Sequence, residues 1–137
     1  MLSILLIMVN TRRFYKELGN LFYAIAAADK RIHKEEKDQL EKEIQETWRK
    51  YDHTTDRFGS DRAFLIEFEF EAMEDESVSA ETAYSRFENF FNENNRQIDF
   101  SLRKTIFGSA RHIAESVRKI NANELSYLVR LKKLMSL

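Results

Sequence analysis

The chain of 137 residues contains no proline and only three glycines, Gly19, Gly59 and Gly108. Proline and glycine punctuate turns, and a sheet protein of this size needs many tight turns. Their scarcity therefore predicts an all-α fold. The length suits a single domain with a core of its own. We expect a compact bundle of six to seven helices joined by short connections.

Apolar residues at helical spacing predict where these helices lie. The pattern indicates helices over residues 11–28 and 34–52, followed by a polar loop over 52–61. Three later helices are expected to begin at residues that make good N-caps, namely Ser79, Asp99 or Ser101, and Asn121. We expect the eleven phenylalanines of the chain to form the core of the bundle.

The segment 62–75 has two interpretations. Residues 67–71 alternate between glutamate and phenylalanine, as in a half-buried strand, whereas Phe64, Leu65, Phe68 and Ala72 suit a helix. No partner strand is recognisable elsewhere in the chain. We therefore predict a helix.

Residues 1–10 form an apolar N-terminal leader ahead of a domain that we assign to residues 11–137. The run MLSILLIMV would span about 14 Å as a helix, against about 30 Å for the hydrocarbon core of a bilayer. It also lacks the cationic start and the cleavage site of a signal peptide. We favour packing of this leader on the domain. Contact with a membrane surface or a partner, and a true start at Met8, are the alternatives.

Composition narrows the function classes. The absence of cysteine excludes a disulfide scaffold and a zinc-thiolate site, and it fits a cytoplasmic protein. Residues 95–137 carry nine basic and three acidic side chains, a net charge of +6, which leaves −7 on the remainder. Residues 63–85 hold seven carboxylates and no base. The simpler interpretation is that each charged segment is a solvated helix face; the alternative is that these faces attract partners of opposite charge. A pI near 6.3 argues against a nucleic-acid binder.

The two ends of the chain are weakly repetitive. Shifting the sequence by 88 residues aligns the segment 14–40 with 102–128, with six identities in 27 positions, where chance gives about two. Each copy is interpreted as a helical hairpin whose bend holds one inward-facing residue, Ile32 or Ile120. We expect the two hairpins to pack side by side, so that Leu18 and Ile113 share one core.

Both hairpins continue with the spacing of a capping box, in which an N-cap side chain and a glutamate three residues later exchange hydrogen bonds with the backbone. The second copy has Asn121 and Glu124, a good pair, whereas the first has His33 and Glu36. Histidine is a poor cap. Glu36 therefore either has a further role or belongs to a site that has drifted.

The bend of the first hairpin resembles that of the tellurite-resistance TerB-like domains. In that family a helix ending in small residues is followed by Asp, usually Gly, an aliphatic residue, a cap and Glu. Asp29, Ile32 and Glu36 fit this pattern, while Lys30 stands where the family usually has Gly and His33 where it usually has Ser.

The resemblance implies a TerB-like bundle with an acidic site at the bends, and a role in stress-response complexes or as an accessory domain that docks protein partners. Asp29 and Glu36 are then candidate ligands of a divalent cation such as calcium, which takes six to eight oxygens. Val117 stands where the second copy should have Asp, which argues against a paired metal site. The structural alternative is a turn followed by a helix cap.

No enzyme is expected from the sequence, because no nucleophile has a recognisable base and no glycine-rich loop could hold phosphate. The alternative function is a metal-dependent carboxylate/histidine bundle, either an enzyme or a metal-storage protein, built on His112 and Glu115. These residues lie three apart, so they share a helix face, but their order is the reverse of the Glu-x-x-His pairs of di-iron bundles. A surface ion pair between them is the simpler interpretation.

Overall fold

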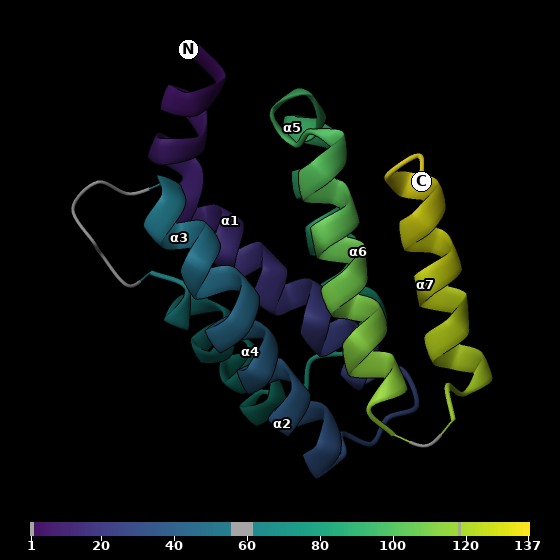
Figure 1. Ribbon diagram of the computed structural model, residues 1–137. Coiled ribbons are helices and arrows are strands. Elements are labelled where there is room, and N and C mark those ends of the chain that lie inside the picture. Colours follow the sequence, from purple (N-terminus) through teal and green to yellow (C-terminus); the bar gives the residue numbers. More distant parts are fainter. Residues whose placement is uncertain (1, 56–61, 118) are drawn as a thin grey trace.

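The computed structural model describes the backbone of residues 2–55, 62–117 and 119–137, and the side chains of residues 11–52, 62–117 and 119–137. These residues form an all-helical bundle without strands, as predicted. The elements are α1 (Leu2–Ala26), α2 (Lys34–Glu43), the π-helix η1 (Ile44–Trp48), α3 (Arg49–Thr55), α4 (Phe64–Asp75), α5 (Ala80–Asn94), the 3₁₀ turn η2 (Asn95–Gln97), α6 (Phe100–Glu115) and α7 (Ala122–Leu134). Because α2, η1 and α3 run on without a break, the described chain has six main helices (Figure 1).

The predicted element positions are largely confirmed. Ser79, Asp99 and Asn121 each cap a helix, since each side chain accepts a hydrogen bond from the backbone N–H three residues later. The predicted loop over 52–61 begins too early, because α3 extends to Thr55. Residues 56–61 of that loop, with Gly59, lie outside the described residues. The backbone of α1 crosses residue 10 without interruption, while the side chains of the predicted leader 1–10 lie outside the described residues.

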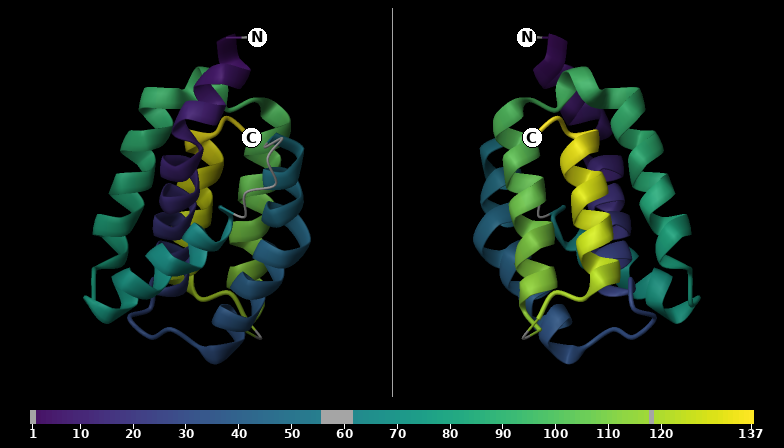
Figure 2. Two further views of the ribbon diagram at one scale, coloured as in Figure 1. Left: turned by 90° about the vertical axis from the view of Figure 1, so that its left-hand side faces the viewer. Right: turned by 90° about the vertical axis from the view of Figure 1, so that its right-hand side faces the viewer.

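Helix α1 lies at the centre of the bundle, between α4 and α5 and beside α6 and α7 (Figure 2). Residues 21–27 are all buried, as expected of a helix that is covered on every side. Gly19 permits its close crossing with α4, since a Cβ there would come within 2.7 Å of the Ile66 carbonyl oxygen. Leu18 and Ile113 belong to one core cluster, so the predicted packing of the two chain ends is confirmed.

The prediction that every phenylalanine lies in the core is wrong. Phe64 and Phe68 of α4 are 54% and 65% exposed, and Phe100 at the start of α6 is 62% exposed. In α4 the inward face instead carries Leu65, Ile66, Phe70 and Met73. Helix α4 therefore turns two aromatic side chains outward.

Candidate functional site

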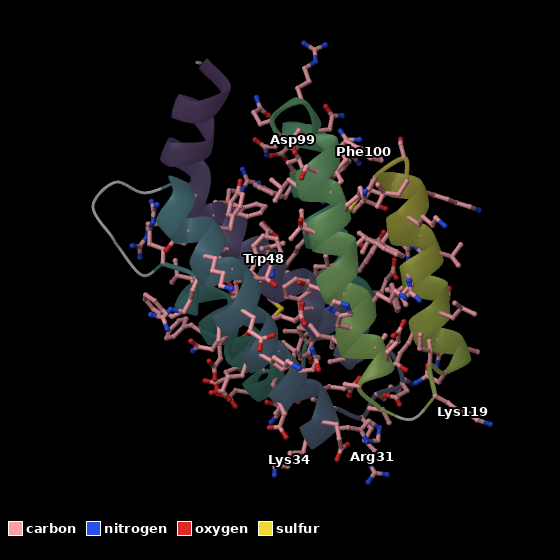
Figure 3. The ribbon with its side chains drawn as sticks, in the orientation of Figure 1. Arg31, Lys34, Trp48, Asp99, Phe100 and Lys119 are labelled. Atoms are coloured by element: carbon pink, nitrogen blue, oxygen red, sulfur yellow. The ribbon has the colours of Figure 1, made fainter. Side chains whose placement is uncertain are left out.

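The two bends of the repeated hairpins meet at one end of the bundle. Figure 3 shows Arg31 and Lys34 of the first bend at the same end as Lys119 of the second. The direct link is a hydrogen bond in which Asn121 Nδ2 donates to Asp29 Oδ2 at 3.1 Å. These residues are 92 positions apart in the sequence, so the side-by-side packing of the two hairpins brings their bends into direct contact.

Asp29 lies just past α1 at the bend, with 27% of its side chain exposed. Its Oδ1 accepts the Arg31 backbone N–H at 3.1 Å, and His33 Nε2 lies 3.6 Å from its Oδ2. Lys30 adopts a left-handed backbone conformation with φ of 66°. The bend thus uses the conformation for which glycine is best suited, and Lys30 accepts it at a cost of about 1 kcal/mol.

The second bend completes its capping box. Asn121 Oδ1 accepts the Glu124 N–H at 2.8 Å, and Glu124 Oε1 accepts the Asn121 N–H at 3.1 Å. The first bend makes only half of the arrangement. Glu36 Oε1 accepts the His33 N–H at 2.8 Å, while the His33 side chain forms no cap hydrogen bond.

Glu36 is fully buried, and Glu124 is 2% exposed. Burial raises the pKa of Glu36 to about 8, against the lowering effect of the His33 N–H, and the Glu124 carboxyl and the Asp29 charge raise it further. Glu36 Oε2 meets no hydrogen-bond donor within the described chain. Two ionised carboxylates only accept hydrogen bonds, so a proton on Glu36 turns its proximity to Glu124 into a bond. The hydrogen bonding of Glu36 beside Glu124 is therefore best satisfied when Glu36 holds a proton.

The carboxylate oxygens at the junction of the two bends provide some of the ligands that a hard divalent cation needs. Carboxylate oxygens are the ligands that calcium and magnesium prefer, and Glu36 Oε2 is an available buried oxygen. However, the described residues contain no group of three or more His, Cys, Asp or Glu side chains placed to hold one metal. A cation at Asp29 and Glu36 would therefore need backbone carbonyl oxygens or water as further ligands.

His112 and Glu115 do not pair with each other, so the predicted surface ion pair is wrong. His112 Nδ1 lies 3.1 Å from Glu43 Oε2, and Glu115 pairs with Arg111. Glu43 also accepts from the Ser109 hydroxyl at 2.7 Å. The sequence analysis missed this contact, although Glu43 lies three residues after Leu40 and so on the apolar side of its helix.

Asp52 stands at the start of the predicted polar loop. It is fully buried in α3 and accepts the Arg62 N–H at 2.7 Å, which ties the two ends of the intervening segment together. Its role is structural. The neighbouring His53 side chain and Asp56 lie outside the described residues.

Comparison of the chain with protein-family models, curated proteins and solved structures finds no match. Among the described residues, no helix is both long and apolar enough to cross a bilayer.

Proposed function

We propose that this chain is a non-catalytic accessory module of TerB-like type, which docks a protein partner and binds a divalent cation at the junction of its two bends. The observation that carries the proposal is the convergence of Asp29, Glu36, Asn121 and Glu124 at that junction. The cation would replace the proton that the two buried glutamates share. We propose in addition that the protein is cytoplasmic and acts in a stress response.

The charges and hydrogen bonds of the junction support this assignment. Glu36 carries an unsatisfied buried oxygen, and Glu124 and Asp29 add negative charge beside it. A cation there relieves the repulsion among three carboxylates. Because it bridges both hairpins, binding would stabilise the packing of the chain ends and hold any docking surface on them rigid.

The cation is tested by thermal unfolding with calcium, magnesium or manganese and with a chelator, at about pH 6 and about pH 8. Because protons and cations compete for Glu36, the rise in Tm should be larger at the higher pH. Glu36→Gln should abolish that rise, whereas Glu46→Gln, which alters an exposed glutamate of η1, should preserve it. Equal melting temperatures with cation and with chelator at both pH values would remove the cation from the proposal.

Docking is tested separately by expressing the affinity-tagged chain in its native organism and purifying it with whatever remains bound. We expect a stoichiometric protein partner to remain bound through size-exclusion chromatography, and mass spectrometry identifies it. Recovery of the tagged chain alone, eluting as a monomer of 16.3 kDa, would contradict the docking role.

A further inference from the structure

The outer face of α6 and the adjoining end of α7 form a groove of about 620 Å³. We call it the α6 groove; its lining includes Phe100, Lys104, Phe107, Gly108, Arg111 and Lys132. Figure 3 shows Phe100 at the end of α6 that lies next to the C-terminal end of α7. The groove is thus an aromatic surface with a basic rim.

The floor of the groove includes a glycine that the fold itself does not require. A Cβ placed on Gly108 would meet no atom within 4 Å, in contrast to Gly19, where it would collide with α4. A glycine inside a helix costs about 1 kcal/mol relative to alanine. At Gly108 this cost leaves a hollow in the exposed surface, with room for a side chain from outside.

The basic rim is only partly neutralised. Arg111 pairs with Glu115, and Lys104 lies over the Phe100 ring at 5.4 Å. Within the described residues neither Lys104 nor Lys132 forms an ion pair, and both are exposed. The groove therefore suits an acidic partner that carries apolar side chains.

A surface of this chemistry is present on the same chain. Phe64 and Phe68 are four residues apart on α4, and Glu67 and Glu71 lie on the same side of the helix, forming what we call the α4 face. Burial and the charges of Glu71 and Glu41 raise the pKa of Glu67. Within the described chain no basic side chain pairs with Glu67 or Glu71, so a basic surface brought from outside would relieve this repulsion.

We propose that the α6 groove receives the α4 face of a second copy of the chain. The ridge of Phe64 and Phe68 enters the groove beside Gly108, while Glu67 and Glu71 face Lys104 and Lys132. Because groove and ridge lie on different faces of one molecule, the contact is head-to-tail and each copy offers both halves. This inference rests on the proposed docking role and names a second copy as the partner.

The test is sedimentation velocity from micromolar to near-millimolar concentration. We expect the mass of the wild type to rise with concentration above the 16.3 kDa of one chain, and the association to weaken in high salt because screening shortens the reach of charges. Two charge-reversed double variants are compared, Lys104→Glu with Lys132→Glu and Glu67→Lys with Glu71→Lys. Each should remain monomeric alone, since its two surfaces now carry like charges.

Mixing the two charge-reversed variants provides the decisive measurement. The acidic groove of one then faces the basic α4 face of the other, and the unaltered surfaces also match, so the mixture should associate. Circular dichroism and Tm verify that each variant is folded, and Phe68→Ser, which keeps every charge, should weaken wild-type association about tenfold through the lost aromatic contact.

Four results would overturn the inference. A wild type that stays at 16.3 kDa throughout has no such contact, and association that survives charge reversal uses another surface. A monomeric wild type that co-sediments with phosphatidylserine vesicles through Lys104 and Lys132 would assign the groove to a membrane. A different protein retained in the affinity experiment alongside a monomeric chain would leave the docking role intact while removing the second copy as its partner.

Discussion

The two bends of the bundle have related sequences and unequal chemistry. The second begins α7 with a complete capping box formed by Asn121 and Glu124. The first has a strained backbone at Lys30 and only half a box, yet it retains Glu36 fully buried. If capping were the only use of the glutamate, the copy without a good cap would have little reason for a fully buried carboxyl group. The difference indicates that Glu36 matters through its partner Glu124.

The largest expected difference between the two bends is the pH dependence of folding stability that Glu36 causes. An ordinary glutamate titrates near 4.5 and Glu36 at about 8, so between these values the folded protein holds one proton more than the unfolded chain. The stability that this proton provides is complete below about pH 4.5 and is lost as the pH rises to about 8, at about 1.4 kcal/mol per pH unit.

Glu36→Gln removes this dependence because its amide is neutral at every pH and can donate to Glu124. Between about pH 6.5 and about pH 8 we expect the wild type to lose about 2 kcal/mol relative to this variant, measured by urea unfolding. Parallel stability curves for the two proteins would mean that Glu36 is already ionised in the folded state.

A smaller difference in stability is expected among variants of the helix N-caps. Asn121→Ala removes both the cap of α7 and the bond to Asp29, so we expect a loss of about 2 kcal/mol. Ser79→Ala, which removes a cap without any link between bends, should cost about 1 kcal/mol. His33→Ala should cost less than either. A loss at Asn121 no larger than that at Ser79 would show that the Asp29 bond adds nothing to stability.

The smallest effect concerns the strained residue. Lys30→Gly should raise the free energy of unfolding by about 0.5 to 1 kcal/mol, because glycine adopts a φ of 66° without strain. The control is Lys119→Gly in the second bend, where glycine should destabilise the protein through the greater freedom of its unfolded chain. Equal changes at the two positions would contradict the strain assigned to Lys30.

Local patterns predicted much of this fold. Helical spacing and capping residues placed the helices, and the small residues before Asp29 placed the end of α1 to within two residues. The outward face of α4 could not be predicted, because Phe64 with Phe68 and Ile66 with Phe70 give that helix two apolar sides. The choice between them depends on the close approach at Gly19, which is a contact between distant parts of the chain.

In the candidate site, too, local patterns identified the residues but not their contacts across the chain. Asp29 and Glu36 were identified from one bend and its family resemblance, and Asn121 with Glu124 from the repeat. The repeat predicted that the two hairpins pack side by side, but the bond between Asn121 and Asp29 depends on how the hairpins are aligned with each other. Spacing within either hairpin carries no information about that alignment. The same reason explains His112, whose partner Glu43 is 69 residues away, whereas sequence reasoning considered only its neighbour Glu115.

The central position of α1 has a consequence for biosynthesis. This helix is the first element of the bundle to leave the ribosome, and α6 and α7, which cover it beside α4 and α5, are the last. At about 5 to 20 residues per second, its apolar surface waits on the order of 5 to 20 s for them. During that interval the nascent chain exposes an apolar helix that its later partners have not yet covered.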